Sequence, residues 1–296
     1  MEFMRSAMFV PGHRQRFIDK ALGGLPADVF LFDLEDGVPP AEKSVGRELL
    51  GQTLTRPRQP GEALRYVRVN GIGSDRLEPD LDAVVRPGVD GLCLPKVDYP
   101  EQIQQVDALL APREAAAGLA AGSLRYIVAI ESPRGLLNAL AIASASPRVA
   151  ALMFGAEDFG LELGLPTHRE GEASELIYAR SALVTAAAAA NVQSIDGVWP
   201  DIQDAEGLRV DCLRARRLGF TGKSLIHPGQ IDTINAAFSP TEGEIDYARR
   251  VVEAFEAAMA RGDGSIAFGG QLIDRPIVER ARRTLAIAEA IGWSAS

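Results

Sequence analysis

Charged side chains follow a series of short apolar runs in this sequence, and their chemical types can bind a cation, an anion or a proton. In chain order they are Asp33, Glu35, Asp36, Arg68, Lys96, Glu131, Asp158, Asp196 and His227. One such residue means little, because Asp33 or Asp196 could equally cap a helix. The full series indicates more, and it predicts a polar site built from the ends of several strands.

Glu131 and Asp158 are the candidates for a metal site. Each follows an apolar run, YIVAI and ALMFGAE respectively, so each carboxylate is expected in a largely apolar environment. An isolated buried carboxylate is costly, and a hard cation removes that cost. Mg²⁺ commonly takes one or two carboxylates, with water and substrate oxygens as its other ligands. The alternative is that the carboxylates form ion pairs with Arg68 or Lys96.

Arg68 is the candidate for binding a substrate anion. Its planar guanidinium can bind a carboxylate through two hydrogen bonds or stabilise the oxygen of an enolate. The alternative is a structural salt bridge to Asp33 or Glu35.

The stretch PGHRQRFIDKAL indicates a second anion site. It places Arg14, Arg16 and Lys20 at the start of the first predicted helix. A helix N-terminus with basic side chains favours phosphate. A solvated basic face is an equally good interpretation.

Cysteine and histidine offer little further chemistry. Cys93 and Cys212 lie in apolar patterns and are expected to be small buried hydrophobes rather than nucleophiles. His13 and His168 lie in loops, where we expect them to be solvated or to cap a helix. For His227 the sequence leaves open whether it lines the site or makes a buried hydrogen bond.

Alternating strands and helices must position these side chains. Continuously apolar runs predict strands that are covered on both faces, and helical patterns separate them. The predicted strands span residues 7–10, 29–33, 65–70, 91–94, 125–130, 150–154, 192–195 and 221–226, and the predicted helices include 14–23, 40–54, 100–120, 134–145, 172–190 and 204–218. Eight strands predict an α/β fold of the (β/α)₈ barrel type, with its active site at the carboxyl ends of the strands. An open doubly wound sheet is the main alternative.

The chain is expected to divide into a barrel domain over residues 1–238 and a C-terminal helical extension over residues 239–296. A long amphipathic helix over 240–262 precedes a Gly-rich, turn-prone segment over 262–274. Another helix follows, with Pro276 near its first turn. This pattern is typical of a lid, or of an arm that contacts a neighbouring subunit. A simple helical cap is the alternative.

Composition excludes several classes of protein. Of 296 residues, 47% are hydrophobic and 24% are charged, which excludes intrinsic disorder as the dominant state. The net charge of -9 argues against nucleic acid as a partner. No apolar run reaches the length of about 18 residues that a membrane span needs, and the N-terminal residues do not form a signal peptide. We therefore expect a cytoplasmic protein that does not enter a membrane.

A set of motifs from Arg5 to about Ala281 resembles the citrate lyase β-subunit group, within the HpcH/HpaI aldolase/citrate lyase superfamily. In family order the motifs are RSAMFVPGHRQRFIDKAL, FLFDLEDGVPPAEK, YVRVNGIGS, GLCLPKV, IVAIESPRGLLN, ALMFGAEDFGLELG, SIDGVWPDIQDAEGL, LGFTGKSLIHPGQI and GGQLIDRPIVERA. Each motif alone is weak evidence, but the ordered set covers nearly the whole chain and is specific.

The resemblance implies a TIM barrel that binds Mg²⁺ and acts on CoA thioesters of malyl, citramalyl or citryl type. It also implies a homo-oligomer, usually a trimer or hexamer. Glu131 of IESPRG and Asp158 of GAEDFG match the metal ligands of the family. Arg68 of RVN matches the residue that contacts the substrate and the developing enolate.

Further roles come from the same resemblance. Glu35 and Asp36 of DLED match residues that support the metal-bound waters and the site. Asp274 of QLIDRP matches an acid/base residue that typically reaches the site of a neighbouring subunit. Arg14 and Lys20 would lie where the CoA nucleotide binds.

These roles imply a carbon–carbon lyase that cleaves or forms the thioester through an acyl-CoA enolate. The metal would polarise an oxygen of the hydroxy- or oxo-acid portion, and Arg68 would stabilise the enolate oxyanion. Asp274 would exchange a proton with the enolate carbon. Because the bonding electrons flow into a thioester carbonyl, no lysine Schiff base is required. Lys96 is therefore expected to be a wall or ion-pair residue.

Three alternatives stay open. The chain could be an aldolase that releases pyruvate without CoA, a non-catalytic subunit with the same fold, or a malyl-CoA thioesterase or malate-synthase-like enzyme. The GGQLIDRP tail and the basic first loop favour a CoA substrate, and the intact carboxylates argue against a non-catalytic protein. The motifs do not separate cleavage from cleavage followed by hydrolysis. They also leave open whether this chain has the acyl-carrier and transferase partners of citrate lyase.

Overall fold

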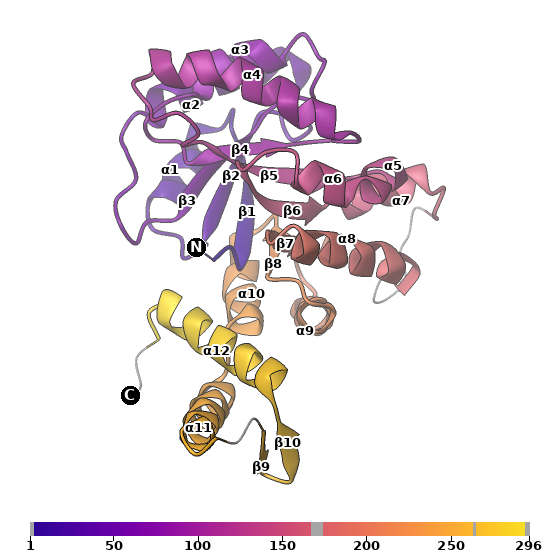
Figure 1. Cartoon of the computed structure of the whole chain (residues 1–296). Coiled ribbons are helices and arrows are strands. Elements are labelled where there is room, and N and C mark those ends of the chain that lie inside the picture. Colours follow the sequence, from indigo (N-terminus) through magenta and orange to yellow (C-terminus); the bar gives the residue numbers. More distant parts are fainter. Residues whose placement is uncertain (1–2, 167–173, 263–264, 294–296) are drawn as a thin grey trace. The chain divides into compact units, whose positions relative to one another are not determined.

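A closed barrel of eight parallel strands forms the larger part of the protein and confirms the predicted (β/α)₈ fold (Figure 1). The computed structural model describes residues 3–166, 174–262 and 265–293. In order around the barrel, the strands are β1 (Ser6–Pro11), β2 (Val29–Asp33), β3 (Leu64–Arg68), β4 (Gly91–Leu94), β5 (Arg125–Ile130), β6 (Val149–Phe154), β7 (Gln193–Asp196) and β8 (Gly222–Leu225). Because β8 pairs with β1, with Ser224 opposite Ala7, the sheet is closed and the doubly wound alternative is wrong.

Alternate residues of the strands fill the barrel interior. Its core includes Val29 and Leu31, Leu64 and Tyr66, Cys93, Ile127 and Ala129, Ala151 and Met153, and Ile195. Successive side chains of a strand point to opposite faces, so the next inward positions at the carboxyl ends are Asp33, Arg68 and Glu131. The alternation therefore brings these three polar residues to one end of the barrel.

Helices cover the outside of the barrel (Figure 1). They are α1 (Gln15–Leu22), α2 (Lys43–Thr53), α3 (Leu77–Val84), α4 (Pro100–Ala116), α5 (Pro133–Leu137), α6 (Ala139–Ala143), α7 (Ala156–Glu162), α8 (Ile177–Ala189), α9 (Ala205–Leu218) and α10 (Ile231–Phe238), with 3₁₀ turns at Pro40–Glu42, Ser174–Leu176 and Pro228–Gln230. The short helices α3, α7 and α10 lie outside the predicted helices. Among the residues that the structure describes, no helix is both long and apolar enough to cross a membrane.

A buried ion pair fixes the beginnings of β5 and β6. Glu114 of α4 binds Arg148 through two hydrogen bonds of 2.7 Å, and Arg148 directly precedes β6. The same carboxylate accepts the N–H groups of Gly122 and Leu124, at 3.0 Å each, just before β5. Burial raises the pKa of Glu114, but these hydrogen bonds outweigh that effect and lower the pKa to about 2. The pair therefore anchors the two strands that lead to Glu131 and Asp158.

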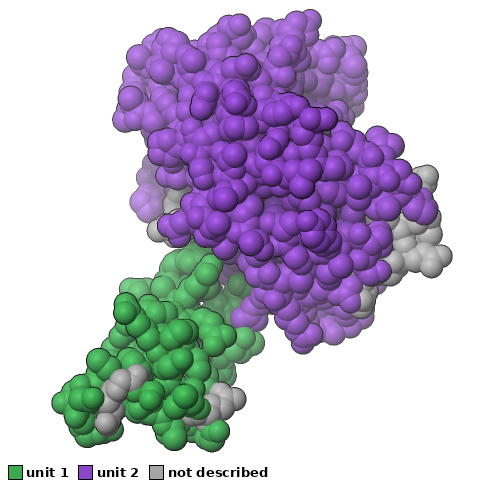
Figure 2. All heavy atoms as spheres, turned by 45° about the vertical axis from the view of Figure 1, so that its right-hand side comes forward, with its two compact units in different colours: residues 1–3, 236–296 green, residues 4–235 purple. Residues whose placement is uncertain are grey.

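Residues 236–296, together with residues 1–3, form a second compact unit (Figure 2). It contains α11 (Glu242–Met259), the antiparallel hairpin of β9 (Ile266–Phe268) and β10 (Gln271–Ile273), and α12 (Arg275–Ala290). Its core joins residues of both helices and the hairpin, including Val251, Ile273 and Val278. The segment expected to be Gly-rich turn is thus partly a hairpin. Gly269 and Gly270 form its turn, with φ of 58° and 79°.

Candidate active site

The loop after β2 is held rigidly by its own acidic and basic side chains. Asp33 accepts the N–H groups of Glu35 at 2.8 Å and of Gly37 at 2.9 Å. Lys43 of α2 is buried, and its Nζ donates to the carbonyl oxygens of Leu34 and Glu35, each at 2.6 Å. Because Asp33 binds the N–H groups of the loop and Lys43 binds its carbonyl groups, the carboxylates of the loop have fixed positions.

Arg68 stands opposite Asp33 in the register of β3 and β2. Its Nε and Nη2 donate to Asp33 Oδ1 at 2.8 Å and Oδ2 at 2.7 Å, and its Nη1 lies 3.2 Å from Glu35 Oε2. Its guanidinium carbon also lies 4.7 Å from the centre of the Phe9 ring. Burial lowers the pKa of Arg68, but the hydrogen bonds and charge of Asp33 outweigh it and raise that pKa above its ordinary value. The salt bridge considered above is therefore present, and its guanidinium stays charged.

Glu131 follows β5 and is only 6% exposed. Its Oε2 accepts the backbone N–H of Lys96 at 3.0 Å. A Cβ at position 155 would overlap Cγ of Glu131 and lie 2.9 Å from its Oε1, so Gly155 is needed for this side chain to fit. Burial, together with the charge of Asp158, raises the pKa of Glu131 to about 7.

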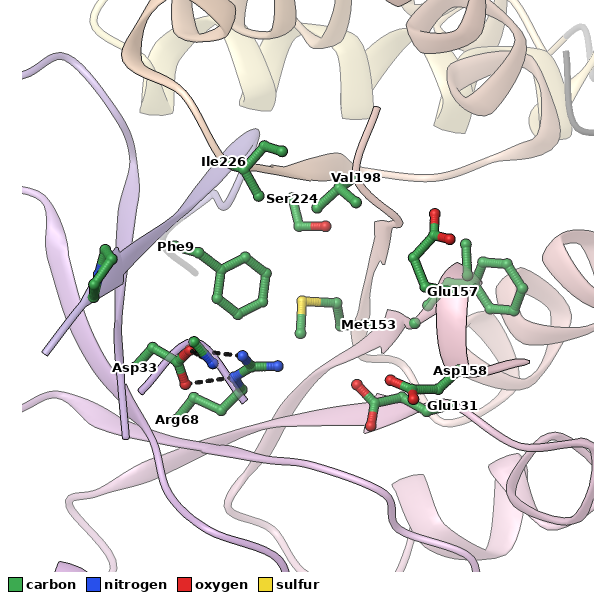
Figure 3. Close-up of a pocket in the computed structure, with 15 residues that line it drawn as sticks. Phe9, Asp33, Arg68, Glu131, Met153, Glu157, Asp158, Val198, Ser224 and Ile226 are labelled. Atoms are coloured by element: carbon green, nitrogen blue, oxygen red, sulfur yellow. Dashed lines mark hydrogen bonds and ion pairs between the residues drawn. The ribbon is translucent and has the colours of Figure 1, made fainter. Parts of the chain in front are cut away.

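Asp33, Arg68, Glu131 and Asp158 line one cavity of about 330 Å³ at the carboxyl ends of the strands (Figure 3). Asp158 comes from the first turn of α7. Figure 3 shows its carboxylate next to that of Glu131, with Arg68 and its partner Asp33 on the other side. The structure thus brings together the two predicted metal ligands and the predicted anion-binding residue.

The donor set of this cavity fits a hard divalent cation. Burial and, to a smaller extent, the charge of neighbouring Asp158 disfavour the ionised form of Glu131 and raise its pKa. In the described ranges no group of three or more His, Cys, Asp or Glu side chains is arranged to hold a metal ion. Glu131 and Asp158 would therefore be the protein ligands, with water and substrate oxygens completing the shell, as is common for Mg²⁺.

Glu35 and Asp36 are joined by Lys96. Its Nζ lies 2.8 Å from Glu35 Oε1 and 2.8 Å from Asp36 Oδ2. Burial raises the pKa of Asp36, but the hydrogen bond and charge of Lys96 outweigh it and hold that pKa below its ordinary value. Lys96 is thus an ion-pair residue, and Glu35 contacts the cavity lining through Arg68.

Five residues of the original series do not line the cavity, namely Glu35, Asp36, Lys96, Asp196 and His227. The last two make their contacts elsewhere. Asp196 follows the inward-facing Ile195 and points outward, where it pairs with Arg180 and Lys223, each at 2.7 Å. It is buried in that network and caps no helix, so both interpretations of Asp196 were wrong. His227 is exposed, and its Nδ1 accepts the N–H of Gly229 at 3.1 Å. It therefore caps a 3₁₀ turn rather than making a buried hydrogen bond.

The first loop and helix differ from expectation in two details. His13 is buried rather than solvated, with its Nε2 3.7 Å from Glu42 Oε2. Arg14 directly precedes α1 and is exposed, but Lys20 lies in the last turn of this short helix, away from its N-terminus. The helix dipole therefore supports an anion near Arg14 and not near Lys20. His168 lies outside the described residues.

Asp274 belongs to the second unit. It precedes α12 with an extended backbone, and its carbonyl oxygen accepts the N–H groups of Ile277 and Val278, each at 3.1 Å. Its side chain is half-buried and makes no capping hydrogen bond. The carboxylate is therefore not used as a helix cap, and its acid/base role stays a prediction.

Sequence reasoning did not single out Glu157 or the uncharged residues that line the cavity, which are Phe9, Pro11, Gly37, Met153, Phe154, Gly155, Ala156, Val198, Ser224 and Ile226. Strand alternation could have found several of them. Phe9 has the same parity as the core residue Ala7, and Gly155 the same parity as Met153. The apolar runs hid this signal because inward and outward positions are both apolar.

A (β/α)₈ barrel with several carboxylates and a guanidinium in one cavity at its carboxyl end has the architecture of an enzyme. The family model described as HpcH/HpaI aldolase/citrate lyase matches residues 5–228, and the chain belongs to this family. It is therefore an enzyme of the lyase class.

Curated relatives match nearly the whole chain. Citrate lyase subunit beta of Escherichia coli (strain K12) is 39% identical over 288 residues, covering 97% of this chain and 94% of the relative. A (3S)-malyl-CoA thioesterase of Cereibacter sphaeroides (strain ATCC 17023) is 37% identical over 287 residues, covering 97% and 95%. The crystal structure of protein CitE from Mycobacterium tuberculosis, in complex with magnesium, acetoacetate and coenzyme A, aligns with a TM-score of 0.78. It is 31% identical, and the alignment covers 97% of this chain and 98% of that one.

Proposed function

We propose that this chain is a Mg²⁺-dependent carbon–carbon lyase that cleaves, or forms, a 3-hydroxyacyl-CoA thioester of malyl-, citramalyl- or citryl-CoA type. The observation that carries the proposal is the single cavity lined by Glu131, Asp158 and Arg68. It is supported by the relative that is a citrate lyase subunit and by the similar structure that contains magnesium, acetoacetate and coenzyme A.

Glu131 and Asp158 hold the cation with their carboxylates. Bound there, Mg²⁺ would polarise a substrate oxygen as a Lewis acid. The Lys96 amide on one oxygen of Glu131 and the tight fit against Gly155 fix the direction of that side chain. This preorganisation of Glu131 favours catalysis because the side chain needs little rearrangement during the reaction.

In cleavage the substrate hydroxyl loses its proton to solvent and becomes a carbonyl group, while the carbon–carbon bond breaks and its electron pair moves into the thioester carbonyl. Arg68 stabilises the oxyanion that forms there. Asp33 takes two of the five N–H donors of the guanidinium and so fixes its plane. Other donors of Arg68 are then directed at the thioester oxygen. Asp274 supplies or removes the proton at the enolate carbon, and Glu35 and Asp36 support the site through Lys96 and Arg68.

The size of the cavity suits the acid portion of the substrate. At about 330 Å³ it lies at the small end of the range of about 300–1,000 Å³ for ligand pockets. Phe9, Met153 and Val198 provide apolar walls for the carbon atoms of that portion. The larger CoA nucleotide then lies outside the cavity, and we keep Arg14 and Lys20 as its proposed contacts.

A second candidate function is cleavage or hydrolysis of malyl-CoA by attack of water on the thioester. It is favoured by the relative named (3S)-malyl-CoA thioesterase, which matches 97% of this chain at 37% identity. In this case the same cavity binds the substrate, and a carboxylate near it must direct a water molecule.

The test incubates the purified chain and Mg²⁺ with malyl-CoA, citramalyl-CoA and citryl-CoA, and identifies products by mass spectrometry. The lyase proposal predicts acetyl-CoA together with glyoxylate, pyruvate or oxaloacetate, respectively. Release of free CoA and the intact hydroxy acid would support the thioesterase instead. No product from any thioester would contradict both.

We further propose that the chain acts in the cytoplasm as a homotrimer or hexamer. In such an oligomer Asp274, which belongs to the second unit, would complete the site of a neighbouring copy, as the family resemblance implies. Light scattering of the full chain measures the assembly, and activity of the purified chain on free CoA thioesters tests whether it needs partner subunits.

A further inference from the structure

Lys96 has an unusual backbone conformation beside the candidate metal site. Its φ is 52°, in the left-handed region, and Asn191 is the other residue besides glycine in the described chain with positive φ. Residues with a side chain disfavour this region, and asparagine tolerates it better than lysine. Such residues persist where surrounding contacts stabilise them, and they cluster at functional sites.

The backbone of Lys96 interrupts the pairing of β4 with β5. Leu94 pairs with Val128 in the regular ladder. The amide of Lys96 then leaves the ladder and donates to Glu131 Oε2 at 3.0 Å, whereas the amide of Val97 returns to the carbonyl oxygen of Ala129 at 3.5 Å. Local interruptions of this kind redirect groups next to active sites. Here the redirected group is a backbone donor, and its target is a candidate metal ligand.

The side chain of Lys96 supplies contacts that stabilise this conformation. Its Nζ binds Glu35 and Asp36, each at 2.8 Å. Glu35 is held in turn by the N–H bond to Asp33 and by Arg68 at 3.2 Å. The ammonium is therefore anchored to the rigid loop after β2.

We propose that Lys96 is a positioning residue for Glu131: its ammonium, bound to Glu35 and Asp36, holds the left-handed backbone that directs the Lys96 amide at one oxygen of Glu131. This leaves the other oxygen of Glu131, which lies against Gly155, for the cation. The inference rests on the proposed Mg²⁺ site and adds a residue that acts on a ligand rather than on the substrate.

The test compares Lys96→Gly with Lys96→Val. Both variants lose the ammonium, so they change the charge near the cation equally. Glycine adopts positive φ freely, whereas valine, which is β-branched, strongly disfavours it. Mg²⁺ binding to the metal-free protein is measured by calorimetry without substrate. We expect the Kd of Lys96→Gly to stay within about threefold of wild type, because glycine reaches positive φ without the help of an ammonium. That of Lys96→Val should rise about tenfold or more, because valine needs such help and has lost it.

Asn191→Val is the matched control, because Asn191 has a φ of 56° at the end of α8. It should lower the melting temperature without changing the Kd for Mg²⁺. If Lys96→Val does not fold, Lys96→Met replaces it, with a smaller rise in Kd expected. Equal Kd values for the Gly and the Val or Met variants would overturn the proposal. Absence of Mg²⁺ binding by the wild-type chain would instead overturn the proposed metal site.

Discussion

Asp33 and Arg68 lie directly opposite each other on neighbouring strands and form a two-point ion pair, with distances of 2.8 and 2.7 Å. The same carboxylate accepts the N–H groups of Glu35 and Gly37. One side chain therefore fixes both the guanidinium that faces the cavity and the acidic loop beside it.

This relationship predicts that Asp33→Asn lowers kcat/KM by about 100-fold, because a small displacement of a catalytic group has an effect of that order. Steady-state kinetics measure the change. Asp28→Asn is the matched control, since Asp28 forms an equivalent two-point pair with Arg5, at 2.8 Å, before β1 and β2. It should lower stability but not kcat/KM. If kcat/KM falls by a similar factor in the two variants, the proposal that Asp33 positions the catalytic guanidinium is wrong.

Gly155→Ala should weaken Mg²⁺ binding and reduce turnover by at least tenfold, because the added methyl group overlaps Glu131. Calorimetry of the metal-free protein and kinetics with added Mg²⁺ measure the two effects. Gly160→Ala, within the helix α7 that begins directly after Gly155, is the control, since its methyl group would meet only Leu165, at 3.7 Å. Alanine there favours the helix by up to about 1 kcal/mol. Wild-type Mg²⁺ affinity in Gly155→Ala would contradict the tight fit described above.

Asp274→Asn should retain thioester binding and lower kcat strongly, by at least 100-fold, because the proton donor to the enolate carbon is lost. If neighbouring subunits complete each other's sites, mixing Asp274→Asn chains with Arg68→Lys chains should restore part of the activity. The measurement is turnover of mixed oligomers after their composition has been confirmed. Unchanged kcat in Asp274→Asn would show that this residue has only a structural role.

The Glu114–Arg148 pair predicts how stability depends on pH. Since the folded pKa of Glu114 falls from the ordinary 4.5 to about 2, its contribution is complete above pH 4.5 and is lost as the pH falls toward 2. Glu114→Gln removes the two-point partner of buried Arg148 and leaves Asp107, at 3.2 Å, as its remaining ionic partner. It should therefore lower the free energy of unfolding by up to about 3 kcal/mol at pH 7. It should also flatten the pH dependence between 4.5 and 2.

Urea unfolding at pH 7, 4 and 3 measures these effects. Glu206→Gln is the comparison, because Glu206 pairs with Arg209 at the surface. Exposed pairs contribute little, so this variant should follow the wild-type curve. A Glu114→Gln curve that parallels wild type at low pH would contradict the inferred pKa.

The fold could be predicted from the sequence because buried parallel strands are continuous apolar runs, and each of the eight lies where a run was found. The short helices α3, α7 and α10 were missed, since seven or eight residues give little periodicity, whereas α1, of similar length, was found because it is more strongly amphipathic. The hairpin β9–β10 was missed because each of its strands has three residues next to glycines.

The site was predicted in part. Its charged members follow strands, but a position after a strand does not show whether the side chain points into the barrel or out of it. For this reason Asp196 was grouped with Glu131. Alternation separates them, because Ile195 points inward and so Asp196 points outward. The roles of Gly155 and the Lys96 amide depend on distances between different strands, and a single sequence without aligned relatives does not contain such distances.

The central claim is that Glu131 and Asp158 hold the cation on which turnover depends. Its most direct test is calorimetric titration of metal-free wild type, Glu131→Gln and Asp158→Asn with Mg²⁺, combined with thioester turnover in Mg²⁺ and in excess EDTA. The account predicts Mg²⁺ binding and activity for wild type only, with both abolished by EDTA and all three proteins folded. Full activity in excess EDTA, or wild-type Mg²⁺ affinity in both variants, would contradict it.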